Sequence, residues 1–139
     1  MDHLTARILY VDDDVDSCEL MELFLRHPGK DYKITALTSV PEAAALISRS
    51  KFDLFVFDYC LSEMDAPEFC KYIRENDSVT PILIFSAMPE QKYRDLAIAS
   101  GATAYLVKPN DLERLPVMVE ALIDGQHSHS AGRPTVDIA

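Results

Sequence analysis

The chain has 139 residues, of which 48% are hydrophobic and 26% are charged, so it fits one globular domain with a substantial buried core. Its formal net charge of −10 at pH 7 disfavours nonspecific attraction to nucleic acid or anionic lipid, and we expect no direct nucleic-acid partner. No stretch approaches the roughly 20 apolar residues of a membrane span, and the N-terminus lacks the apolar region of a signal peptide. We therefore expect a soluble cytoplasmic protein without a membrane partner.

Short apolar runs alternate with segments of helical periodicity along the chain. The apolar runs predict five strands, at residues 8–11, 32–36, 54–57, 82–85 and 104–107. Apolar residues at helical spacing predict five helices, whose stripes are Cys18, Met21 and Leu25; Ala43, Leu46 and Ile47; Phe69 and Ile73; Leu96 and Ala97; and Leu112, Leu115, Val119, Leu122 and Ile123. This (βα)5 pattern is typical of the α/β class, with a doubly wound parallel five-stranded sheet covered by helices on both faces.

Glycine and proline mark several expected helix boundaries. Pro28-Gly29 predicts the end of the first helix and Gly101 the end of the fourth. Pro116 lies several residues after Asp111, the expected cap of the last helix. We therefore predict that this helix begins late or kinks at the proline.

From Gly125 onward the sequence has few apolar residues and no periodicity. We predict a domain at residues 1–124 and a flexible C-terminal tail at residues 125–139. His127 and His129 form an HxH pair in this segment, for which a solvated tail is favoured over a metal site.

The three cysteines are Cys18, Cys60 and Cys70, an odd number without CxxC or Cys/His metal-binding spacing. Neither a disulfide framework nor structural zinc is expected from such a pattern. We interpret all three as reduced, small core residues.

Polar residues follow four of the predicted strands. Asp12, Asp13 and Asp14 come directly after the first, and the others are followed by Asp58, Ser86 and Lys108. Each has an ordinary explanation, because an aspartate can cap a helix or turn, a serine can satisfy a loop amide, and a lysine can be solvated at the rim. The carboxyl ends of parallel strands share one edge of the sheet, however, and four equivalent positions favour a common site.

Phosphoryl transfer to a carboxylate is the chemistry that suits these residues. Asp58 would be the nucleophile and would form an aspartyl phosphate. Because an anion then approaches an anion, Asp12 and Asp13 would supply a Mg²⁺ site. Lys108 would bind phosphate oxygens as a compact positive charge, and Ser86 would donate its hydroxyl to another oxygen. A covalent phosphate adds about −1.5 to −2 charges, enough to bias a nearby two-state element.

Four segments of the chain resemble the receiver domain of two-component response regulators: ILYVDDD at 8–14, DLFVFD at 53–58, FSA at 85–87 and GATAYLVKP at 101–109. The similarity covers roughly residues 5–124. It implies a flavodoxin-like fold with strand order 2-1-3-4-5. It also implies that Asp58 accepts a phosphoryl group from the phosphohistidine of a histidine kinase or phosphotransfer protein.

The same resemblance implies roles for individual residues. Asp12 and Asp13, with Asp58 and the backbone carbonyl of Cys60, would bind Mg²⁺. Ser86 and Tyr105 match the hydroxyl and aromatic switch positions, Lys108 matches the conserved-type lysine, and Lys108-Pro109 would carry a cis peptide bond. Such a domain is a signalling phosphoacceptor rather than an enzyme, although it assists its own phosphorylation and dephosphorylation. It would switch binding to a downstream protein partner or output domain, or form a phosphorylation-dependent dimer.

The sequence departs from the family pattern after the phosphoacceptor. The loop reads Leu61-Ser62 and Met64-Asp65-Ala66 where Met-Pro and Met-Asp-Gly are usual, which alters its stiffness. Asn110 replaces the aromatic residue common after Lys-Pro. Cys60 and Met88 are expected to flank the approach of hydrolytic water, and neither orients water well.

Three other interpretations compete with an active receiver. A hydrolase of the haloacid dehalogenase type also uses an aspartate nucleophile, but it requires a second aspartate at position 60, which is Cys60 here. A flavodoxin-like binding module would need a Ser/Thr-rich phosphate loop. A degenerate receiver used for docking would lack core residues that this chain retains. The sequence leaves open whether the receiver acts alone, in a phosphorelay, or as part of a longer kinase or regulator.

Overall fold

The computed structural model describes residues 5–26 and 31–127. Within them, parallel strands alternate with helices. The strands are β1 (Ala6–Val11), β2 (Tyr32–Leu37), β3 (Leu54–Phe57), β4 (Ile82–Ser86) and β5 (Ala104–Val107). The helices are α1 (Val15–Leu25), α2 (Val40–Arg49), α3 (Ala66–Arg74), α4 (Gln91–Ala99) and α5 (Leu115–His127), with a 3-10 turn, η1 (Leu112–Arg114), before α5.

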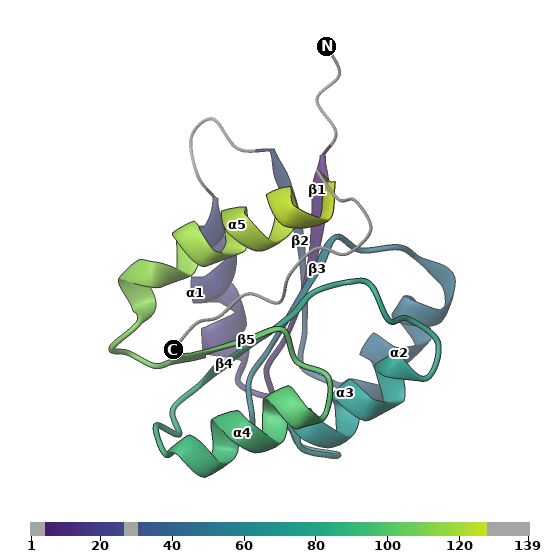
Figure 1. The fold of residues 1–139 in the computed structure, drawn as a ribbon. Coiled ribbons are helices and arrows are strands. Elements are labelled where there is room, and N and C mark those ends of the chain that lie inside the picture. Colours follow the sequence, from purple (N-terminus) through teal and green to yellow (C-terminus); the bar gives the residue numbers. More distant parts are fainter. Residues whose placement is uncertain (1–4, 27–30, 128–139) are drawn as a thin grey trace.

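The strands form one five-stranded sheet with the order β2-β1-β3-β4-β5, and every neighbouring pair is parallel. Helices α1 and α5 cover one face, and α2, α3 and α4 cover the other (Figure 1). The predicted α/β class, the doubly wound arrangement and the strand order are therefore confirmed. All five strands end at the same edge of the sheet.

Strand β1 illustrates why these strands are continuous apolar runs. Ile8 and Tyr10 belong to the core beneath α1 and α5, whereas Leu9 and Val11 belong to the core on the opposite face. All four side chains are fully buried. Because successive side chains of a strand point to opposite faces, a strand covered on both sides has no position for a solvated residue. The polar side chains of β1 therefore stand near its two ends, with Arg7 close to its start and Asp12 directly after it.

Side-chain caps fix the start of three helices next to this edge. Asp14 caps α1 by accepting from the amide of Asp16 at 3.3 Å, and Ser39 caps α2. Asp65 caps α3 and forms a reciprocal capping box with Glu68. Of the three consecutive aspartates, Asp14 thus has the capping role.

The boundaries of the last two helices follow from local chemistry. Gly101 ends α4 with a φ of 119°, and a Cβ there would lie 2.6 Å from Cγ of Arg74. Helix α5 starts at Leu115, after the 3-10 turn, so Pro116 stands in its first turn. Asp111 precedes the 3-10 turn, as expected for a cap, but its carboxylate makes no capping bond. It accepts from the backbone amide of Val107 at 2.9 Å instead.

Two sequence predictions fall partly or wholly outside the described residues. Pro28-Gly29 lies in the gap at 27–30, and His129 lies in 128–139. Helix α5 continues to His127, past the predicted boundary between domain and tail at residue 124. That boundary stays a prediction, because residues 128–139 lie outside the described part of the chain. Among residues 5–26 and 31–127, no helix is both long enough and apolar enough to cross a membrane.

The cysteine prediction was right for two residues and wrong for the third. All three cysteines are free thiols, and Cys18 and Cys70 are buried. Cys60 is exposed, because it lies in the loop after β3 rather than within a strand or on the buried face of a helix.

Candidate functional site

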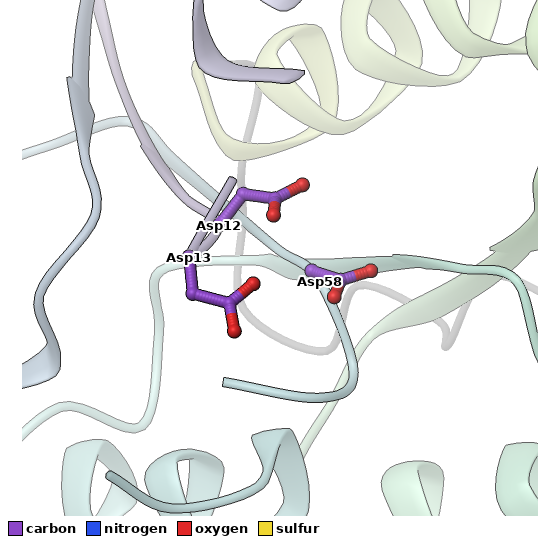
Figure 2. Close-up of side chains that lie close together, drawn as sticks. All are labelled: Asp12, Asp13 and Asp58. Atoms are coloured by element: carbon purple, nitrogen blue, oxygen red, sulfur yellow. The ribbon is translucent and has the colours of Figure 1, made fainter. Parts of the chain in front are cut away.

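Three carboxylates meet where β1 and β3 end. Oxygen atoms of Asp12, Asp13 and Asp58 all lie within 4.8 Å of one another, as their arrangement in Figure 2 illustrates. The backbone amide of Asp58 donates to the carbonyl of Val11 at 3.0 Å, which holds the two strand ends together. Asp12 is buried, Asp58 is half-buried and Asp13 is exposed, so the cluster opens to solvent on one side.

Lys108 bridges two of these carboxylates from the end of β5. Its Nζ lies 3.1 Å from Oδ1 of Asp58 and 3.2 Å from Oδ2 of Asp12. The same ammonium lies 5.6 Å from the ring centre of Phe85, and the Lys108 amide donates to the carbonyl of Ser86 at 2.7 Å. Lys108-Pro109 has the cis peptide bond that the resemblance implied.

Burial and charge act against each other in this cluster. Burial raises the pKa of Asp58 above its ordinary value, and Asp12 adds to that effect while Lys108 opposes it. Burial alone would lower the pKa of Lys108, but Asp58 and Asp12 outweigh it and raise that pKa. Lys108 is therefore charged at neutral pH. One ammonium does not balance three carboxylates, and their oxygen atoms are the donors that a hard divalent cation prefers.

The side chains of Ser86 and Tyr105 both bond to the backbone of Met88, in the loop after β4. The backbone amide of Met88 donates to Oγ of Ser86 at 3.0 Å, and the hydroxyl of Tyr105 donates to the carbonyl of Met88 at 2.7 Å. Both side chains are buried, and burial raises the pKa of Tyr105. The guanidinium of Arg94 lies 5.5 Å from the centre of the Tyr105 ring.

Hydrogen bonds join the two ends of the loop after Asp58 and tie it to other segments. Its two ends are paired, because the amide of Ala66 donates to the carbonyl of Tyr59 at 2.8 Å. Oε1 of Glu63 accepts from the amide of Val40 at 3.2 Å, which ties the loop to the start of α2. The hydroxyl of Ser62 donates to Oδ2 of Asp13 at 3.4 Å. The loop is thus tied to the segments that follow β1 and β2.

Tyr10 belongs to this site and was not among the predicted residues. Its hydroxyl donates to Oδ2 of Asp12 at 2.7 Å, and both side chains are buried. Two features of the sequence pointed to it. A tyrosine in a buried strand needs a partner for its hydroxyl, and residues two apart on a strand face the same side.

Comparison with known proteins gives the family. The response regulator receiver domain matches residues 8–120 of the chain. The chain is 32% identical over 136 residues to the transcriptional regulatory protein ZraR of Escherichia coli K12, covering 98% of this chain and 30% of that protein. We conclude that the chain belongs to the receiver domain family of two-component response regulators.

Solved structures agree with this assignment. A two-component response regulator from Clostridium difficile is 32% identical, with a TM-score of 0.77 over 86% of this chain and 96% of that one. A CheY-like receiver domain protein from Methanospirillum hungatei, at 24% identity and a TM-score of 0.79, shares the fold over 91% of this chain and all of its own. The chain spans about 30% of the length of the curated relatives that it matches. The family assignment therefore favours the receiver domain over the hydrolase and the binding module.

Proposed function

We propose that this domain accepts a phosphoryl group on Asp58, in the presence of Mg²⁺, from the phosphohistidine of a histidine kinase or phosphotransfer protein. The observation that carries the proposal is the position of the Asp58 carboxylate. It lies within 4.8 Å of two further carboxylates and 3.1 Å from the Lys108 ammonium. Its side chain is 17% exposed, so a donor can approach it from solvent.

Asp12, Asp13 and Asp58 would hold the Mg²⁺, with the backbone carbonyl of Cys60 as a further ligand. The donor set fits this ion, because Mg²⁺ is bound through carboxylate oxygens and completes its shell with water and phosphate oxygens. When bound, Mg²⁺ supplies positive charge that offsets the repulsion between the carboxylates and the incoming phosphoryl group.

The chain's own side chains perform the transfer. A carboxylate oxygen of Asp58 attacks phosphorus, forming the O–P bond as the N–P bond to the donor histidine breaks. Lys108 moves its ammonium to a phosphoryl oxygen and offsets the charge gathered there. Ser86 donates its hydroxyl hydrogen to another phosphoryl oxygen, and its Oγ can keep the bond from the Met88 amide. Hydrolysis returns Asp58 to its carboxylate when water attacks the same phosphorus, the O–P bond to Asp58 breaks and inorganic phosphate leaves.

The phosphorylated state would be reported through Ser86 and Tyr105. Since both side chains bind Met88, a shift of Ser86 toward the phosphoryl group would change the loop that also holds Tyr105. The outcome would be altered binding of a downstream protein partner or output domain, or a phosphorylation-dependent dimer. The net charge of −10 supports a protein partner over direct binding to nucleic acid or membrane.

The test is phosphorylation by a small donor. After incubation with Mg²⁺ and acetyl phosphate, we expect intact mass spectrometry to detect one added phosphate on the wild-type protein and none on Asp58→Asn. Asp16→Asn, which changes an exposed aspartate of α1, is the matched control and should incorporate phosphate like the wild type. Equal incorporation in the wild type and Asp58→Asn would overturn the assignment.

A further inference from the structure

We propose that Tyr10 is a positioning residue whose hydroxyl holds Asp12 in place and thereby releases Lys108 to the phosphoryl group. This inference rests on the proposed function. It is carried by one shared atom, because Oδ2 of Asp12 accepts from the Tyr10 hydroxyl at 2.7 Å and from the Lys108 ammonium at 3.2 Å.

Asp12 depends on these donors because it is 2% exposed. Its Oδ1 accepts from the backbone amide of Asp14 at 3.0 Å, whereas Oδ2 is served by the side chains of Tyr10 and Lys108. A buried carboxylate oxygen that loses its donor is strongly destabilised. When Lys108 moves away from Asp12, the Tyr10 hydroxyl is therefore the side-chain donor that remains on Oδ2.

Lys108 has two tasks that compete. In the unphosphorylated protein it bonds both Asp12 and Asp58, and during transfer its charge is needed at the phosphoryl oxygens. The side chain of Lys108 is 25% exposed, so the core does not enclose it. Tyr10 is the fixed partner: its ring is fully buried in the core beneath α1 and α5. Its hydroxyl remains on Asp12 while the lysine shifts.

Removing only the hydroxyl separates this role from packing. Tyr10→Phe keeps the ring in the core but leaves Lys108 as the side-chain donor to Oδ2 of Asp12. The lysine is then held back, and the phosphoryl group loses part of its positive partner. We expect affinity for beryllofluoride at saturating Mg²⁺, and the rate of phosphorylation by acetyl phosphate, each to fall about fivefold, the effect of one net hydrogen bond.

A double-mutant cycle with Lys108→Ala tests the mechanism. If Tyr10 acts by releasing Lys108, the fold-change that Tyr10→Phe causes in these two quantities should shrink once the lysine is gone. If Tyr10 merely supports the core, the same fold-change should appear in both backgrounds. Tyr72→Phe is the control, because it removes a hydroxyl from a tyrosine of α3 that is 44% exposed and lies outside the carboxylate cluster. It should change neither quantity.

The titrations would be followed by NMR, and thermal melting would verify that each variant is folded. An unchanged beryllofluoride affinity in Tyr10→Phe, or an equal loss in the Lys108→Ala background, would overturn the inference while leaving the proposed function intact. Failure of the wild-type protein to bind beryllofluoride would overturn the proposed function and this inference with it.

Discussion

The two sides of the site differ in how their side chains are held. On one side, Asp12, Asp58 and Lys108 are joined by ion pairs between the ends of three strands. On the other, Ser86 and Tyr105 are neutral, buried and bonded to the amide and carbonyl of a single residue, Met88. The ion pairs can be exchanged for contacts with a cation or a phosphoryl oxygen, whereas both bonds of the neutral pair end on the backbone of Met88. We therefore expect the charged residues to govern the transfer and the bonds to Met88 to link Ser86 with Tyr105.

Replacing Lys108 should have the largest effect on phosphorylation, because Lys108 is the cation of the charged side formed by Asp12, Asp58 and Lys108. For Lys108→Ala we expect the rate of phosphorylation by acetyl phosphate to fall about 100-fold, as for the loss of one preorganised donor to a developing charge. Phosphate incorporation followed over time by mass spectrometry measures the rate. Lys71→Ala, an exposed lysine of α3, is the control and should react like the wild type. A decrease of less than about threefold would contradict the role given to Lys108.

Mg²⁺ should act on the charged side and leave the neutral side unaffected. At a Mg²⁺ concentration ten times its dissociation constant, linkage predicts about 1.4 kcal/mol of added stability and a rise in Tm of about 5 °C. Thermal melting with Mg²⁺, and again after chelation by EDTA, measures the shift. Asp13→Asn should remove most of it, and Ser86→Ala should retain it. The same shift in Asp13→Asn and wild type would place the ion elsewhere.

The neutral side should respond to a phosphate mimic through Met88. With beryllofluoride and Mg²⁺, we expect NMR shift changes at Met88 and Tyr105 as well as at the three carboxylates. Ser86→Ala removes the hydroxyl that links the two sides, so the changes at Tyr105 should shrink while those at Asp13 remain. Changes confined to the carboxylate cluster in the wild type would show that Tyr105 does not take part in the readout.

The smallest effect concerns the lifetime of the phosphorylated state. Cys60 is exposed and Met88 is half-buried, and neither side chain orients water well. Exchanging both for polar residues, as Cys60→Asn with Met88→Glu, should speed phosphate loss by a few fold, less than the 10²–10⁴ that a positioned acid or base supplies. The decay after removal of the donor measures this. Unchanged or slower decay would indicate that both residues only pack against the loop.

Much of the site follows from where polar residues stand in the sequence. Asp12, Asp58, Ser86 and Lys108 each stand at the end of an apolar run, and a parallel sheet brings such ends to one edge. The same reasoning gave the strand pattern, and the structure confirmed the fold.

Contacts within a buried strand or between two loops were not predictable in this way. A hydroxyl in an apolar run, as in Tyr10, finds its partner only through the conformation at the strand end. The bond from Val40 to Glu63 joins residues 23 apart in sequence, and it depends on the path of the loop after β3. Cys60 was misplaced in the core for the same reason, since loop exposure has no periodic signal.

The bond between Glu63 and Val40 has a consequence for hydrogen exchange. The amide of Val40 stands in the first turn of α2, where an α-helix supplies no backbone acceptor, and its partner is the carboxylate of Glu63 in the loop after β3. Exchange of this amide with deuterium therefore follows how often the Glu63 carboxylate leaves it. The amide of Val40 in α2 thus reports on the motion of the loop after β3.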